Sequence, residues 1–178
     1  MRKFIFATLL FTAHIGTAQI YKSTSGTIKF YSEELLEDIT AVNNKVKSIF
    51  DSETNKVVFS VPIMGFVFNK SLMQEHFNEK YLESEKYPKA TFQGAISNYE
   101  VGKSNPEVWA EGELEIHGVK NKVKVPGTLN FTDQRLVLHT VFMIKLVDYK
   151  IKVPQLMFQR IAEEIEVTID IEYIAYEK

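Results

Sequence analysis

The chain has 178 residues, no cysteine, and 21 basic against 23 acidic side chains, so its formal net charge is −2. Without a long block of like charge, it lacks the basic footprint of a nucleic-acid-binding protein, and we expect no nucleic acid partner. The lack of cysteine excludes disulfides and excludes lipid attachment to a thiol, so stability must come from a packed core.

The first 18 residues have the three parts of a secretory signal peptide. Arg2 and Lys3 give a basic start, residues 4–11 are apolar, and small residues at Gly16 and Ala18 have cleavage-site spacing. The apolar run is much shorter than the roughly 20 residues of a membrane-spanning helix. We therefore expect cleavage after Ala18, export to the periplasm or the medium, and one mature domain over 19–178 without a transmembrane segment.

Short runs that alternate apolar and polar residues fill most of the remaining chain. Turn residues separate these runs, as is typical of an antiparallel sandwich or barrel. We predict about eight strands, over residues 27–31, 43–50, 56–68, 90–99, 108–116, 119–131, 135–146 and 164–174. Pro62 and Gly65 predict a bend within the third run, because proline cannot donate to a ladder and glycine permits unusual dihedrals. The predicted fold class is therefore all-β.

One segment breaks the β pattern and predicts a short helix over residues 72–82. Ser71 and Gln74 have the spacing of a capping box. Apolar side chains recur every four positions, on one face of a helix, at Met73, Phe77 and Tyr81. In a barrel joined mostly by hairpins, we expect this amphipathic helix to lie across an open end as a lid or plug.

The most informative hairpin surrounds His117-Gly118. Histidine tolerates a positive φ and glycine adopts it freely, so these two residues predict a type I′ turn between Ile116 and Val119. The resulting register places acidic residues opposite basic ones: Glu115, Glu113 and Glu111 against Lys120, Lys122 and Lys124. The other face of the hairpin is small and mostly apolar. One face is therefore wet and the other is buried, which gives the barrel an outside and an inside.

Three separated segments resemble the YceI-like family of exported lipid-binding proteins. They are HFNEKYLESEKYPKATFQG at the helix and the next strand, GELEIHGVKNKVKVP at the hairpin, and DYKIKVP with EEIEVTIDIEY near the end. The resemblance covers residues 27–173. It implies a lipocalin-like antiparallel β-barrel of about eight strands, with one short helix covering an end. It also implies a cavity that takes polyisoprenoid chains, isoprenoid quinones or similar lipids.

Two positions depart from the family pattern. Gln74-Glu75 precede His76, where the family often has Arg-Asp, and this change removes a cation that could meet an anionic head group. Lys150 stands where the family usually has glycine after an aromatic residue. Both departures concern the ligand more than the fold.

A ligand in the barrel would contact inward-facing apolar residues, which alternation identifies. The predicted ligand-binding wall comprises Phe59, Val61, Phe66, Phe68, Phe92, Ile96, Leu114, Leu138, Phe142, Ile144, Ile169 and Ile171, with Met73, His76 and Phe77 at the mouth. Inward side chains can fill a barrel of this size or leave room for one ligand, and alternation alone does not separate these outcomes. Two hypotheses follow: an exported carrier of a long apolar amphiphile, and an envelope adaptor with a solid barrel that binds another protein.

The polar residues give no sign of a catalytic or metal site. After the signal peptide, His76, His117 and His139 are scattered over helix, turn and strand, without ligand spacing. The turn explains His117, and alternation places His139 outside. For His76 two roles stay open: contact with a polar head group, and a solvated or capping role. We find no serine hydrolase or phosphate-loop pattern and expect a non-enzymatic protein with no cofactor and no metal. Whether the protein forms a homodimer stays an open question at this point.

Overall fold

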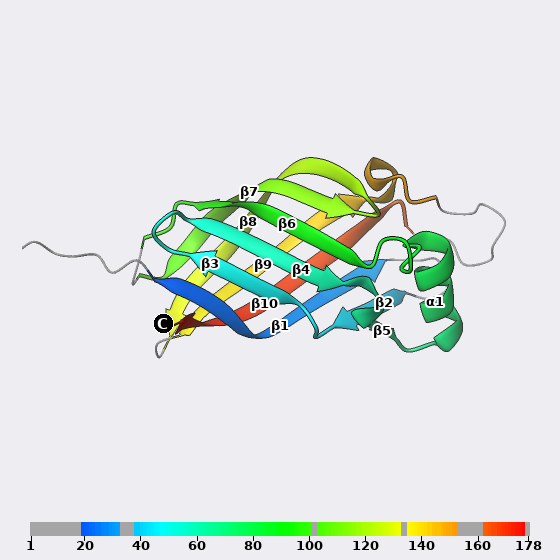
Figure 1. The fold of residues 1–178 in the computed structure, drawn as a ribbon, viewed down its shortest axis with the longest axis horizontal. Helices are drawn as coiled ribbons and strands as arrows, with labels where there is room; N and C mark the ends of the chain where they lie inside the picture. Colours follow the sequence, from blue (N-terminus) through cyan, green and yellow to red (C-terminus); the bar gives the residue numbers. More distant parts are fainter. Residues whose placement is uncertain (1–18, 33–37, 101–102, 133–134, 153–161, 177–178) are drawn as a thin grey trace, which may run out of the picture.

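Figure 1 shows an elongated barrel of strands with a short helix at one end. This computed structural model describes residues 19–32, 38–100, 103–132, 135–152 and 162–176. The predicted signal peptide lies outside the described residues. The barrel is built from β1 (Ile20–Ser32), β3 (Lys47–Asp51), β4 (Lys56–Pro62), β6 (Lys89–Ser97), β7 (Asn105–Ile116), β8 (Val119–Thr132), β9 (Arg135–Lys145) and β10 (Glu164–Tyr176).

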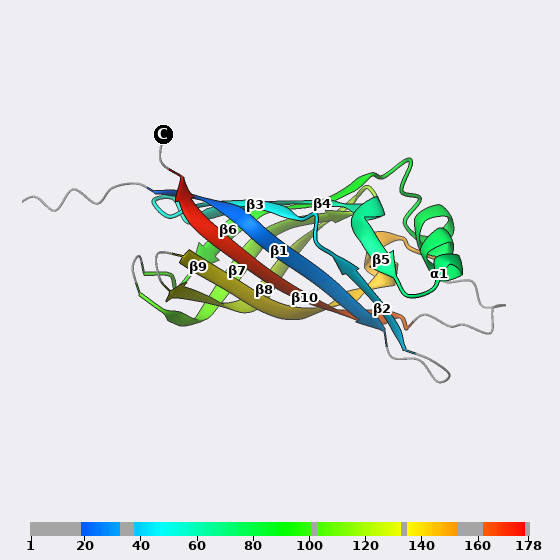
Figure 2. The same cartoon turned by 90° about the horizontal axis from the view of Figure 1, so that it is seen from below.

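These eight strands close into one antiparallel ring within the part of the chain that is described. Each pairs with the next in the order β1, β3, β4, β6, β7, β8, β9 and β10. The ring closes because β10 also pairs with β1, from Ile20 opposite Tyr176 to Tyr31 opposite Glu166. Figure 2 shows these two strands side by side along the barrel. The predicted antiparallel β-barrel is confirmed.

Three further elements lie at the helix end, and the predicted single strand over 43–50 is wrong. They are β2 (Ile39–Asn43), η1 (Ile63–Gly65) and β5 (Phe66–Phe68). The strand β2 ends at Asn43 and the chain bends there. The buried side-chain Oδ1 of Asn43 accepts a hydrogen bond from the backbone N–H of Lys45 at 2.8 Å. The Asn43 amide also donates to the carbonyl of Pro62 at 2.8 Å. One side chain therefore holds two chain bends together, and the bend predicted at Pro62 and Gly65 is confirmed.

The predicted helix is present, but its start differs from the prediction. It consists of α1 (Ser71–His76) and a wider turn, η2 (Phe77–Tyr81). Lys70 is the N-cap residue, no side chain caps the helix, and the capping box is wrong. Instead, the Gln74 side-chain oxygen accepts a hydrogen bond from the backbone N–H of Phe68 at 3.4 Å. Gln74 thus satisfies a donor of β5, which is an edge strand among the described residues.

The hairpin around His117-Gly118 has the predicted turn and register. The φ angles are 53° at His117 and 71° at Gly118, and Ile116 pairs with Val119. On the outer face, the Nζ atom of Lys120 lies 2.8 Å from a carboxylate oxygen of Glu113. This pair is diagonal, because Lys120 stands opposite Glu115, and an exposed ion pair of this kind adds little to stability.

Aromatic side chains fill the interior at the end opposite the helix. Tyr21, Phe50 and Tyr173 are almost completely buried there. The ring of Tyr21 lies 6.2 Å from the ring of Phe50, and Phe50 meets Tyr99 edge-on at 5.1 Å. The hydroxyls of Tyr173 and Ser48 lie 2.7 Å apart. This aromatic cluster (Tyr21, Phe50, Tyr99 and Tyr173) blocks the interior at one end of the barrel.

Candidate ligand cavity

The interior between the aromatic cluster and the helix is open. It forms a cavity of about 160 Å³ whose wall exposes only apolar atoms. Its wall includes most of the residues nominated by alternation: Phe59, Val61, Phe66, Phe77, Phe92, Ile96, Leu114, Leu138, Phe142, Ile144 and Ile169. Successive side chains of a strand point to opposite faces, so alternation found the right face of each strand. Whether these residues contact a ligand stays a prediction.

Small inward residues on three neighbouring strands create part of this space. Ala90 on β6, Ala110 on β7 and Gly127 on β8 all line the cavity. Between β6 and β7 the backbones approach closely, because a Cβ atom on Gly94 would lie 2.4 Å from the carbonyl oxygen of Glu111. The backbones of β6 and β7 are therefore closely packed at Gly94.

A second, smaller cavity of about 50 Å³ lies under the helix. We call it the vestibule. It is lined by Phe30, Ile39, Phe68, Met73, His76, Phe77, Tyr81, Leu82, Leu146, Ile151 and Ile165. The nominated mouth residues Met73, His76 and Phe77 and the wall residue Phe68 therefore meet here. The face of the helix predicted to point inward does so.

Phe77 lies at the boundary between the two cavities, because it lines both of them. Its ring stacks on Phe30 with centroids 5.6 Å apart and planes inclined by 22°. It also lies 5.5 Å from the ring of Phe66 and 5.0 Å from that of Phe68. Phe30 and Phe77 line both cavities, while Phe66 belongs to the wall of the main cavity and Phe68 to that of the vestibule.

One nominated residue lies elsewhere, and several lining residues were missed. Ile171 is buried but lines neither cavity, and its Cδ1 atom would be 2.6 Å from a Cβ atom on Gly26. The missed residues include Ile28, Phe30, Ile63, Val123, Val125, Leu146, Ile151, Ile165 and Val167. Alternation within their strands could have found most of them. Leu146 and Ile151 lie in and beyond η3 (Leu146–Tyr149), where no periodic pattern signals burial.

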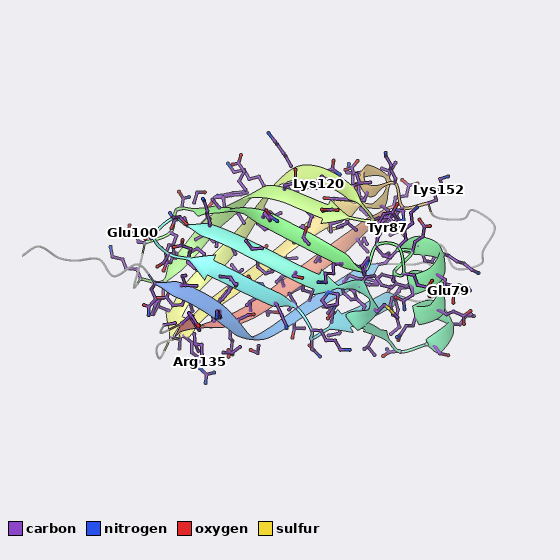
Figure 3. All side chains as sticks on the ribbon, viewed as in Figure 1. Glu79, Tyr87, Glu100, Lys120, Arg135 and Lys152 are labelled. Atoms are coloured by element: carbon purple, nitrogen blue, oxygen red, sulfur yellow. The ribbon has the colours of Figure 1, made fainter. Side chains whose placement is uncertain are left out.

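His117 does more than form its turn. One ring nitrogen lies 2.7 Å from a carboxylate oxygen of Glu83, and the other lies 3.3 Å from the carbonyl oxygen of Tyr149. The ring of Tyr87 meets that of His117 at 4.5 Å. The hairpin tip is thereby joined both to the segment after η2 and to η3. Figure 3 shows Tyr87 at the helix end of the barrel.

The other described polar groups lie mostly on the outer surface. His139 points outward, as predicted, and its ring lies 2.7 Å from the carboxylate of Asp170. Over the described ranges of the chain, no three His, Cys, Asp or Glu side chains gather closely enough to hold a metal ion. None of the helices there has the length and apolar character needed to cross a membrane.

Comparison with known proteins identifies the family. The family model of the YceI-like domain matches residues 11–173. The chain belongs to the YceI-like family. This match begins inside the predicted signal peptide and ends at Tyr173, within the last barrel strand, β10. A search of curated proteins found no match to the chain.

Solved structures share the YceI-like fold at low sequence identity. A polyisoprenoid binding domain from Saccharophagus degradans, described as implicated in plant cell wall breakdown, superposes with a TM-score of 0.76 at 14% identity, over 88% of this chain and 98% of that one. BcnA of Burkholderia cenocepacia gives 0.70 at 17% identity, over 83% and 95%. The YCEI protein of Campylobacter jejuni gives 0.57 at 14% identity, over the full length of both chains.

Proposed function

We propose that this YceI-like protein is an exported carrier that holds the long apolar chain of a polyisoprenoid, an isoprenoid quinone or a similar lipid inside its barrel. The observation that carries the proposal is the cavity of about 160 Å³ with a wholly apolar wall. The Saccharophagus degradans neighbour, described as a polyisoprenoid binding domain, supports the same class of ligand. The predicted signal peptide supports export to the periplasm or the medium.

The wall chemistry explains why an apolar chain fits and a polar ligand does not. Each Å² of apolar surface removed from water contributes about 25 cal/mol, which is offset in part by the ordering of a flexible tail. A polar group placed against this wall would lose its hydrogen bonds to water and gain none. Because no polar atom faces the main cavity, binding rather than a reaction is the activity that the site favours.

The alternative, an adaptor with a solid barrel, depends on a filled interior. Wall residues such as Ala110 and Gly127 leave space that bulkier residues would occupy. This space favours the carrier over the adaptor.

The carrier hypothesis is tested by what the folded protein takes up. The full chain is expressed in a bacterium, recovered from the periplasm or the medium, and its bound lipids are identified by mass spectrometry. After delipidation, the protein is offered geranylgeraniol. We expect a co-purified isoprenoid or similar lipid, and saturable uptake after delipidation. A folded, delipidated protein that takes up no isoprenoid would refute the carrier.

A further inference from the structure

The vestibule differs chemically from the main cavity because two of its lining side chains, His76 and Tyr81, carry polar atoms at their ends. His76, at the end of α1, lines the vestibule and is half-buried. Within the described part of the chain its ring nitrogens have no hydrogen-bond partner. The other lining side chains are aliphatic or aromatic, and Tyr81 alone among them carries a further polar atom. An imidazole offers one donor and one acceptor when neutral.

We infer that His76 is the head-group site of the barrel and binds an uncharged oxygen, a hydroxyl or a quinone carbonyl, at the end of the ligand. This inference rests on the proposed carrier function. The aromatic cluster blocks the opposite end, so a chain that fills the cavity has its polar end at the helix. Phe77 lies where the apolar cavity adjoins the vestibule, and His76 is its neighbour in sequence. The tail therefore lies below Phe77 and the head lies beside His76.

The surroundings of His76 disfavour an anionic head group. No lysine or arginine lines the vestibule among the described residues. Gln74, two residues before His76, is directed to the backbone of β5 rather than to the vestibule. The exposed charges on the same helical segment are Glu75, Glu79 and Lys80, so the segment is net acidic and does not attract a phosphate. Burying an anion without a compensating cation is strongly unfavourable, so a neutral head is selected.

Three ligands with the same saturated C20 tail test this inference: phytanol, phytanyl phosphate and the hydrocarbon phytane. Each displaces radiolabelled geranylgeraniol from the delipidated mature protein. We expect phytanol to bind at least tenfold more tightly than phytanyl phosphate. His76→Leu weakens phytanol binding by about three- to tenfold, the contribution of one hydrogen bond, and leaves phytane binding unchanged. His76→Gln, which keeps a donor and an acceptor, retains most of the affinity for phytanol.

The matched control is His139→Leu, since His139 lies on the outer surface beside Asp170. It changes the affinity of none of the three ligands. The head-group site is refuted, with the carrier intact, if His76→Leu weakens phytane and phytanol equally, if it affects neither, or if phytanyl phosphate binds more tightly than phytanol. If the folded wild-type protein binds none of the three, the carrier function fails and the head-group site fails with it.

Discussion

Replacing Ala110 with leucine adds three carbon atoms to a position of β7 that faces the main cavity. Each buried methylene contributes about 0.8 kcal/mol, so three contribute about 2.4 kcal/mol. Fixing the leucine side chain costs about 0.5–1 kcal/mol. The cavity of about 160 Å³ has room for three carbons. The free energy of unfolding of the delipidated protein should therefore rise by about 1.5–2 kcal/mol, since the new atoms fill empty space.

Urea denaturation measures this change as a higher midpoint at an unchanged slope. For a domain of this size the melting temperature should rise by about 3–8 °C. The same variant should take up less geranylgeraniol, because the leucine occupies the space of the tail. Ala95→Leu is the matched control, since Ala95 lies exposed on the outside of β6, opposite Glu111. It should change stability by less than about 0.5 kcal/mol and leave uptake unaltered.

If the interior were already packed, Ala110→Leu would lower the free energy of unfolding instead of raising it. Overpacking a filled core lowers the free energy of unfolding by about 1–3 kcal/mol. A less stable Ala110→Leu protein with normal uptake would therefore refute both the open cavity and its use as the binding site.

Three other changes test the surroundings of the cavity by urea denaturation. His117→Ala should lower the free energy of unfolding by about 1–3 kcal/mol, because Glu83 and a backbone carbonyl lose their partner, whereas His139→Ala at an exposed pair should cost under about 1 kcal/mol. An equal loss of unfolding free energy in the two variants would contradict the role of His117 in joining the hairpin tip to its neighbouring segments. Gly94→Ala should cost about 1–3 kcal/mol, since its Cβ would lie 2.4 Å from a backbone oxygen of β7, and a neutral result would rule out that close approach. Tyr99→Phe should add about 1 kcal/mol at neutral pH, because the Tyr99 hydroxyl is buried without a hydrogen-bond partner among the described residues. Burial raises the pKa of Tyr99 from 10.0 to about 12, because it disfavours the charged phenolate. The free energy of unfolding of the wild-type protein should therefore fall as the pH rises from about 10 to about 12, and that of Tyr99→Phe should fall less. An equal alkaline loss in the variant would contradict this assignment.

Local rules were sufficient wherever neighbouring residues determine the geometry. His117 and Gly118 alone fixed the turn, and the turn fixed the pairing of β7 with β8. The separation of four residues between Met73 and Phe77 identified the face of the helix that lies over the barrel. Strand alternation likewise separated the cavity wall from the outer surface.

The sequence did not reveal features that depend on distant partners. Asn43 falls within an alternating run and reads as an ordinary strand residue. Its role becomes visible only when Pro62, which accepts its amide hydrogen bond, is beside it. The capping box failed for the same reason, because Gln74 bonds to the backbone of Phe68 instead of to its own helix.

The open interior is also a non-local property, because it depends on which side chain sizes meet across the barrel. Along the cavity wall, Ala90, Ala110 and Gly127 leave volume, whereas Tyr21 and Phe50 remove it at the end opposite the helix. The side-chain sizes in the cavity wall and in the aromatic cluster can therefore change separately while the fold is retained. In the proposed carrier, the position of the aromatic cluster would limit how far a tail can enter, while the vestibule would determine which head group is accepted. Substitutions in the cluster should change the preferred tail length without changing the preference for a neutral head.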